Sequence, residues 1–439
     1  MEFEDVVNEL MDSSSSSSSS SDDDDEIYTA AEHIVLSDIV NPACHHGSVE
    51  GHRVVNRDRQ SGHCRLYEDY FSDNPTYGQS YFKCRFRMRH HMFVRIMNAV
   101  EKYDDYFVQK RNAAGTLGLS CLQKVMAAIQ MLAYGVATGA MDDYIRIGES
   151  TALEILRKFV RAVVQVFGHE YLRLPNEDDT ARLLAIGESR DFPGMLGSIG
   201  CMHWTWKNCP YAWQGMYRGV DTIFLHEPTI ILEAAASKDL WIWHAFFGMP
   251  GLHNDINVLH RSPIFARLAE GQGPQVNYSI NGNDYTMGYY LADGIYPSWA
   301  TFVKTIPEPR GNKNKYFAKA QEACRKDVER AFGVLQARFA IVQAPTHVWD
   351  EDTIQLVMTA CIIMHNMIVE DEGVDEKDFR YDDVGEKVTV SHDATPEFDA
   401  FMQNYKKIKD KETHTQLQAD LIEHLWHNFS DLYTNITIE

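Results

Sequence analysis

The chain reads GMLGSIGCMHW over Gly194–Trp204, an apolar run that predicts a β-strand. Two more apolar runs, Pro228–Ala236 and Leu240–Gly248, flank a polar triplet and predict a hairpin. A further strand is predicted over Tyr285–Ala292. Helical periodicity follows over Phe317–Phe339 and Asp352–Glu370. This succession predicts an α/β fold, with a mixed sheet flanked by helices.

Residues 41–175 precede the α/β segment and are predicted to form a helical, basic domain. A short helix, a turn at Gly148 and a second helix over Ala152–Phe167 resemble a helix-turn-helix. A plain helical subdomain with a solvated basic face fits the same pattern equally well. The sequence leaves both interpretations open.

The formal net charge of the 439-residue chain is −22, and it is unevenly placed. Residues 1–40 hold 12 acids and no base, and residues 370–399 hold 12 acids and 3 bases. The middle, residues 41–369, holds 33 acids and 34 bases. The total argues against a protein that wraps nucleic acid with its whole surface. A near-neutral body with two acidic appendages, however, is compatible with DNA binding at a local basic surface.

The composition also predicts how the ends of the chain are organised. Residues 1–40 are expected to form a disordered tail, because nine serines followed by acids bury no apolar surface. Residues 371–399 are expected to be an acidic linker, and residues 400–439 an amphipathic helix for the core or for a partner. No secretory signal or membrane span is expected.

Cysteine usage indicates an intracellular protein. The eight cysteines include no C-x-x-C pair, which fits reduced thiols. A His- and Cys-rich stretch from Cys44 to Cys64 could bind zinc, but its spacing matches no known ligand pattern.

Two carboxylates stand out by their position. Asp293 ends the predicted strand in Leu291-Ala292-Asp293-Gly294, where a tight turn frees its side chain. Glu329 lies at the edge of the apolar stripe of the predicted helix that follows. On spacing alone, either residue is better explained as a solvated or capping side chain than as a metal ligand.

Several motifs in order nevertheless resemble one family. They are Gly197-Ser198-Ile199, Cys201-Met202-His203-Trp204, His253-Asn254-Asp255-Ile256-Asn257, Leu291-Ala292-Asp293-Gly294, Asp327-Val328-Glu329-Arg330-Ala331-Phe332-Gly333 and Ile362-Ile363-Met364-His365-Asn366-Met367. Together they closely resemble the PIF/Harbinger-type transposases of the DDE superfamily. The resemblance implies an RNase H-like nuclease domain over residues 190–370. It also implies metal-dependent DNA cleavage and strand transfer with two Mg²⁺ or Mn²⁺ ions held by three carboxylates.

The resemblance assigns Asp293 and Glu329 as catalytic residues and metal ligands, and it places the first carboxylate at position 200. That position is occupied by Gly200, which offers no ligand. Asp191 and Asp255 are not obvious replacements. We therefore expect cleavage to be lost or severely impaired. A catalytically inactive, domesticated protein that binds DNA or a protein partner is the alternative.

DNA is the partner that the resemblance implies, and it also implies a separate Myb-like DNA-binding protein and a nuclear location. A homo-oligomer is left open. The candidate DNA-binding residues are basic side chains from the helical domain and from the segment around Glu329: Lys83, Arg85, Arg87, Arg89, Arg157, Lys158, Lys313, Lys315, Arg325 and Lys326.

Overall fold

The structure is a computed structural model. It describes residues 57–113, 115–135, 142–218, 227–264, 266, 274, 276–346, 348–373 and 405–436. Residues Arg57–Glu439 form one compact unit. The acidic tail, the first part of the His- and Cys-rich stretch and most of the acidic linker lie outside the described residues.

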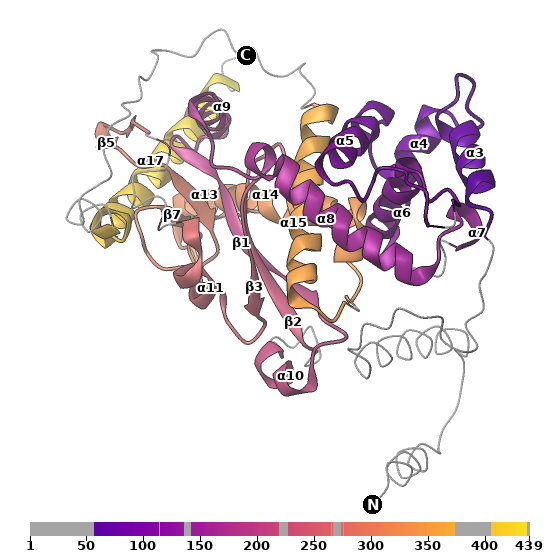
Figure 1. The fold of residues 1–439 in the computed structure, drawn as a ribbon. Helices are drawn as coiled ribbons and strands as arrows, with labels where there is room; N and C mark the ends of the chain where they lie inside the picture. The colour runs from indigo at the N-terminus through magenta and orange to yellow at the C-terminus, as the bar shows by residue number, and fades with distance from the viewer. Residues whose placement is uncertain are drawn as a thin grey trace, which may run out of the picture. The chain divides into compact units, whose positions relative to one another are not determined.

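A five-stranded mixed sheet lies at the centre of this unit (Figure 1). Its strands are β1 Met195–Thr205, β2 Thr229–Ala236, β3 Ile242–Pro250, β6 Tyr289–Ala292 and β7 Phe302–Lys304. Their order is β3-β2-β1-β6-β7. The pairs β1–β2 and β2–β3 are antiparallel, and β1–β6 and β6–β7 are parallel. The predicted first strand, the hairpin and the α/β class are confirmed.

The single strand expected over Tyr285–Ala292 is wrong, because the chain forms two strands there. β5 Asn283–Tyr285 pairs with β4 Tyr278–Ile280 in a separate hairpin, and β6 begins at Tyr289. Between them the chain passes close over β1. A Cβ added to Gly288 would lie 2.6 Å from Leu196 Cδ1, so only glycine fits this crossing.

Gly197 is required where β1 meets β2. Its φ of +152° and the irregular pairing between β1 and β6 at this point place its Cα against the end of β2. A Cβ added at Gly197 would lie 2.5 Å from the Ala236 carbonyl oxygen. Any side chain here would push the two strands apart, which explains the glycine that opens the Gly197-Ser198-Ile199 motif.

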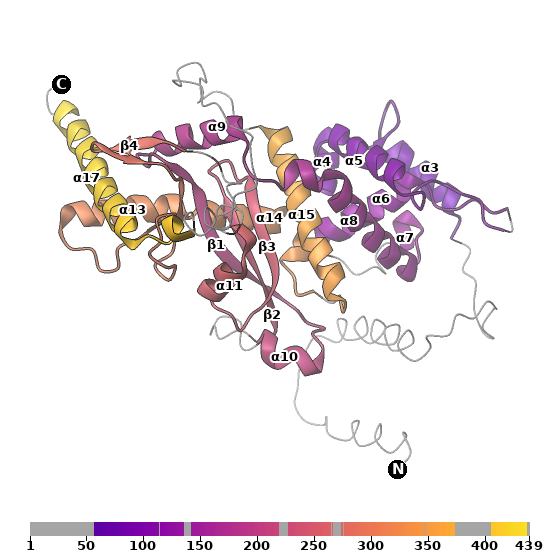
Figure 2. The same cartoon turned by 60° about the vertical axis from the view of Figure 1, so that its left-hand side comes forward.

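Helices cover both faces of the sheet (Figures 1 and 2). On one face lie α13 Gly311–Arg325, α14 Asp327–Arg338 and α15 Glu351–Glu372. Apolar side chains of α14 and α15 form one buried cluster with those of β2 and β3. On the other face, α11 Asp255–Arg261 packs against β2 through Val258. The short helix α10 Tyr211–Tyr217 follows β1 at the end of the sheet.

The helix expected over Phe317–Phe339 is broken at Lys326, so that α13 and α14 are separate. The predicted buried stripe is nevertheless confirmed, because Cys324, Val328, Phe332 and Leu335 are all buried. The break lets α13 pack beside β6 and β1 while α14 packs over β1 and β2.

The helical first part of the chain consists of α3 Arg59–Tyr70, α4 Gln79–Phe86, α5 His90–Tyr103, α6 Cys121–Tyr134, α7 Asp142–Ile145 and α8 Glu149–Tyr171. The helices are confirmed, whereas the helix-turn-helix is not. α7 is only 4 residues long. The 23-residue α8 buries its apolar face against α6 and along α15, so it joins the helical region to the sheet.

α15 packs against both the helical region and the sheet. Within the described part of the chain it is the helix long and apolar enough to cross a membrane, and it is packed between α8 and β3. Buried Asn366 donates to the carbonyl oxygens of Tyr171 and Ile242, each at 2.7 Å, and accepts from the Ile242 N–H. The amide therefore ties α15 to both neighbours.

Two further helices complete the unit. Between α8 and β1 lies α9 Glu177–Glu188, whose first turn is closed by a reciprocal cap between Asn176 and Asp179. The C-terminal amphipathic pattern forms α17 Lys411–Ile436. Its Leu417, Leu421 and Leu425 are buried against α13 and the sheet, so the pattern serves the core of this chain.

Candidate active site

The register of two neighbouring strands brings position 200, in the middle of β1, beside position 293, which directly follows β6. β1 and β6 are parallel, and Ser198 lies opposite Leu291. Two residues further along each strand, the register places Gly200 beside Asp293. The period of two along a strand sends both positions to the face that carries α13 and α14. Asp293 is exposed, and its Oδ1 accepts the N–H of Gly294 at 2.5 Å, which fixes the carboxylate at the turn.

β1 also holds the helix that carries Glu329. The Ser198 hydroxyl oxygen accepts the Val328 N–H at 2.9 Å and so caps the first turn of α14. Val328 then lies directly over Gly200, because a Cβ added there would be 3.2 Å from Val328 Cγ1. Position 200, Asp293 and Glu329 thus come from three elements joined at one edge of the sheet.

A buried amide fixes the end of β6. Gln321 on α13 is fully buried, and its Nε2 donates to the carbonyl oxygens of Ala292 and Val303, each at 3.0 Å. These two bonds clamp the last residue of β6 and its neighbour on β7 immediately before Asp293. This role could not be predicted from the sequence, because Gln321 is one of several polar residues on an amphipathic helix.

Arg325 lies between the two carboxylates. Its Nη1 donates to Glu329 at 2.8 Å, while its Nε and Nη2 form a two-pronged contact with Glu322 at 3.1 and 2.8 Å. The pKa of the guanidinium is raised by its hydrogen bonds to Glu322 and also by the negative charges of Glu329 and Asp293. Arg325 therefore balances part of the negative charge at this edge.

The two acids considered as replacements for the missing carboxylate lie elsewhere. Asp191 precedes β1 at its other end and accepts from Asn428 on α17 at 2.8 Å. Asp255 begins α11, on the opposite face of the sheet, where its charge acts on Cys201. Burial raises the pKa of the Cys201 thiol well above its ordinary value, so that residue stays protonated and is a poor ligand.

The donor set at this edge does not fit a complete two-metal site. Two carboxylates remain where the resemblance implies three, and Gly200 supplies no oxygen. One oxygen of Glu329 is bonded to Arg325. Throughout the described ranges, no group of three His, Cys, Asp or Glu side chains is arranged to hold a metal ion.

The residues flanking the site mostly serve packing. Trp204 and Trp206 are buried, and their Nε1 atoms donate to the carbonyl oxygens of Ala344 and Val348, each at 2.8 Å. His244, also buried, contacts Glu233 and Ser262 on the face opposite Gly200. None of these side chains is directed at the edge that carries Asp293.

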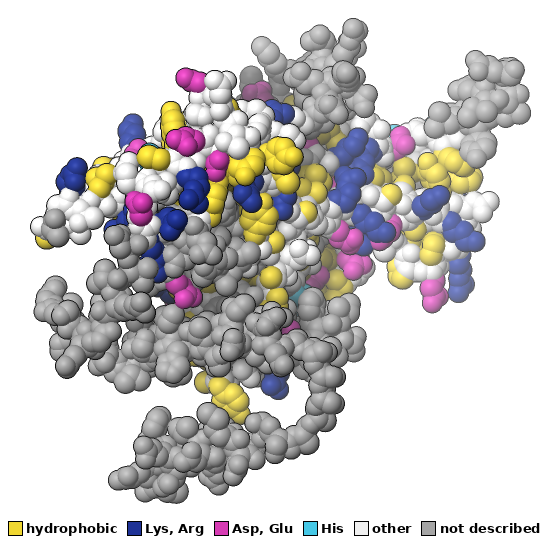
Figure 3. Space-filling view, turned by 90° about the vertical axis from the view of Figure 1, so that its right-hand side faces the viewer, with side chains coloured by type: hydrophobic (Ala, Val, Ile, Leu, Met, Phe, Trp, Pro, Cys, Tyr) yellow, Lys and Arg dark blue, Asp and Glu magenta, His cyan; other side chains and the backbone are white. Residues whose placement is uncertain are grey.

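Most of the candidate DNA-binding cations have partners inside the fold. Lys83 pairs with Glu372 at 2.8 Å, and Lys313 pairs with Glu423 at 2.6 Å. Other contacts involve Arg85 with Tyr70, Arg87 with the Tyr134 ring, Arg89 with Asp371, Lys158 with the Tyr106 ring, Arg325 with Glu322 and Glu329, and Lys326 with Glu322. Within the described part of the chain, Arg157 and Lys315 make neither a hydrogen bond nor an ion pair and are exposed. On the face shown in Figure 3, Lys and Arg side chains are interspersed with acidic and apolar ones.

Comparison with known proteins identifies the α/β part. A family model described as plant transposon protein matches residues 169–376, which include β1, the hairpin, Asp293, Glu329 and α15. Residues 169–376 are therefore similar to DDE-type transposases. The resemblance inferred from the motifs is confirmed. A second model, a domain of unknown function, matches residues 62–101 in the helical region.

One curated relative supports the same family. The chain is 21% identical over 308 residues to "Protein ALP1-like" of Arabidopsis thaliana, a match that covers 67% of this chain and 73% of that protein. No solved structure matches. The roles of position 200, Asp293 and Glu329 therefore depend on the motifs and on the geometry described above.

Proposed function

We propose that this chain descends from a metal-dependent DDE transposase and retains a DNA-holding body in which phosphodiester cleavage is lost or severely impaired. The single observation that carries the proposal is the residue beside Asp293 on β1, which is Gly200. A DDE enzyme needs an oxygen ligand there, and glycine has none.

The topology supports an RNase H-like core. The order β3-β2-β1-β6-β7, with three antiparallel strands followed by two parallel ones, is the order expected of that fold. In such a core the carboxylates stand on the first strand, after its parallel neighbour and on a helix packed over the first strand. We assign these three places to Gly200, Asp293 and Glu329.

Asp293 and Glu329 are positioned by contacts that do not involve residue 200. Ser198 caps α14, and Gln321 clamps the end of β6. When bound, Mg²⁺ or Mn²⁺ would supply charge neutralisation and an activated oxygen nucleophile. Two carboxylates, one of them paired with Arg325, do not complete the two-metal site that such cleavage requires.

The test is metal-dependent nicking of supercoiled DNA by the wild-type chain, Gly200→Asp and Gly200→Asn. The backbone at Gly200 accepts a side chain, because its φ lies outside the left-handed region and Val328 needs to move by only a few tenths of an ångström. Restoring a ligand is expected to raise the nicking rate on the order of 10³-fold. The asparagine variant matches the size without the charge and should stay at background. Wild-type nicking as fast as that of Gly200→Asp, abolished by Asp293→Asn, would refute the proposal.

The partner and location implied by the resemblance are part of this proposal. A Myb-like DNA-binding protein would supply target recognition that a near-neutral body lacks, and both would act in the nucleus. Co-purification of the two proteins tests this part separately from cleavage.

A further inference from the structure

A wide-open surface depression of about 580 Å³, called the cavity below, lies between α14 and the turn that joins β2 to β3. Lys238 and Leu240 line it from the turn, and Arg330, Gly333 and Val334 line it from α14. Arg330 directly follows Glu329, so the cavity begins one residue from the candidate active site. From the sequence, Arg330 belongs to a basic segment expected to contact phosphate, whereas Lys238 was assigned no role.

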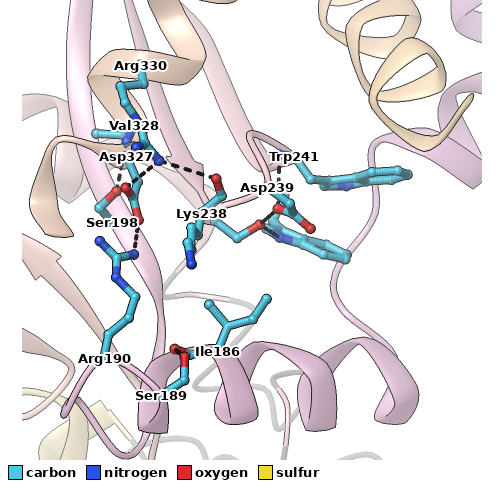
Figure 4. A network of polar contacts seen from close by, with 12 residues as sticks. Ile186, Ser189, Arg190, Ser198, Lys238, Asp239, Trp241, Asp327, Val328 and Arg330 are labelled. Carbon is cyan, nitrogen blue, oxygen red and sulfur yellow. Dashed lines mark hydrogen bonds and ion pairs between the residues drawn. The ribbon is translucent and has the colours of Figure 1, made fainter. Parts of the chain in front are cut away.

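Polar contacts of Ser237 and Asp239, the neighbours of Lys238, fix the turn that carries Lys238 (Figure 4). The Ser237 hydroxyl donates to the Asp239 carboxylate, and Trp243 Nε1 donates to the Ser237 hydroxyl oxygen at 2.9 Å. Arg182 on α9 forms an ion pair with Asp239. Because its neighbours on both sides are fixed, the backbone of Lys238 is fixed as well.

Arg330 is held on the opposite wall of the cavity. Its Nη2 donates to Asp327 at 2.8 Å and lies 3.3 Å from the Lys238 carbonyl oxygen. Asp327 is buried and also forms an ion pair with Arg190. Two guanidinium groups therefore share one carboxylate, so the charge of Arg330 is only partly balanced.

Positive charge exceeds negative charge around the cavity. Its lining contains two cations, Lys238 and Arg330, and no carboxylate, while the nearby Asp239 and Asp327 are paired with Arg182 and Arg190. Lys238 is exposed, and its ammonium group makes no hydrogen bond or ion pair with any described residue. An anion entering here would meet an unpaired ammonium group and a guanidinium held in place.

We propose that this cavity binds a phosphate group of a nucleic-acid strand. Phosphate oxygens accept charge-assisted hydrogen bonds from both kinds of cation. Leu240 and Val334 offer apolar contact to a sugar, and Gly333 leaves open space, since a Cβ added there would meet nothing within 4 Å. The choice of nucleic acid over another phosphate carrier rests on the proposed function, and the site itself requires no metal or cleavage.

The test is the salt dependence of duplex DNA binding, measured by fluorescence anisotropy with the full chain in EDTA, so that cleavage plays no part. The slope of log K against log salt is negative, and losing one phosphate contact decreases its magnitude by about 0.9. We expect this decrease for Lys238→Gln and a larger one for Lys238→Gln combined with Arg330→Gln. Lys411→Gln, which removes an exposed lysine at the start of α17, is the matched control and should keep the wild-type slope.

Each outcome decides the proposal. A wild-type slope for Lys238→Gln, or no DNA binding by the wild-type chain at low salt, would overturn it. Tighter binding of a multiply phosphorylated serine peptide than of DNA with as many phosphates would assign the cavity to a phosphoprotein instead. Wild-type nicking would refute the proposed loss of cleavage and leave this site untouched, and a wild-type slope for Lys238→Gln would remove this site and leave the proposed function standing. Absence of DNA binding would refute both the site and the DNA-holding body.

Discussion

Protonation of His365 on α15 is expected to weaken its contacts with Arg338 of α14 and with the Leu240 carbonyl oxygen before β3. The ring is fully buried on α15. Its Nε2 lies 2.8 Å from the Leu240 carbonyl oxygen, and Arg338, the last residue of α14, contacts its Nδ1 at 3.2 Å. The carbonyl needs a donor and the guanidinium needs an acceptor, so the neutral ring with its proton on Nε2 satisfies both. A second proton on Nδ1 would face the positive charge of Arg338.

The size of the effect follows from the pKa of His365. Burial, and then the charge of Arg338, lower it from 6.5 to about 4. Below pH 6.5 the unfolded chain takes up a proton that the folded chain refuses, so stability is complete above pH 6.5 and falls as the pH drops toward 4. The full difference corresponds to about 3 kcal/mol, of which about 2 kcal/mol is lost between pH 7 and pH 5.

The assay is urea unfolding of wild type, His365→Gln and His169→Gln at pH 7 and pH 5. Glutamine can donate to Leu240 and accept from Arg338 but does not titrate, so its free energy of unfolding should fall by about 2 kcal/mol less than that of wild type. His169 is exposed on α8, and its replacement should leave the wild-type dependence unchanged. Equal losses in wild type and His365→Gln would refute the reasoning.

Two other substitutions test the joints around the candidate site. Gln321→Leu removes the amide that bonds the Ala292 and Val303 carbonyl oxygens, and we expect a loss of about 1–3 kcal/mol in unfolding free energy; a loss below 0.5 kcal/mol in urea titration would contradict the clamp. Arg190→Met leaves buried Asp327 with Arg330 alone and is expected to cost about 3 kcal/mol; thermal unfolding would reveal it, and a midpoint equal to that of wild type would argue against the role of this ion pair.

The elements that local patterns specify were predictable. β1, the β2–β3 hairpin, α15 and α17 follow from apolar runs and helical spacing. The capping pair Asn176 and Asp179 is a sequence signal for the start of a helix, so α9 was predictable despite the charged composition of its segment.

The departures from prediction arise from tertiary contacts. The break at Lys326 follows from Ser198 capping the Val328 N–H, a contact between residues 130 positions apart. The split before β6 depends on the close passage of Gly288 over Leu196. Spacing alone could not assign Asp293 or Glu329, and the missing charge at position 200 was recognisable only through the family resemblance. Whether Lys238 and Arg330 face one cavity depends on how α14 and the hairpin turn pack together.

Mn²⁺ binding tests most directly the claim that position 200 lacks the third carboxylate of a metal site. Electron paramagnetic resonance can count free Mn²⁺ in titrations of wild type, Gly200→Asp and Gly200→Asp combined with Asp293→Asn. We predict at least about tenfold tighter binding by Gly200→Asp than by wild type, corresponding to about 1.4 kcal/mol, and loss of that gain in the double variant. Wild type that binds Mn²⁺ as tightly as Gly200→Asp, through Asp293, would contradict the account.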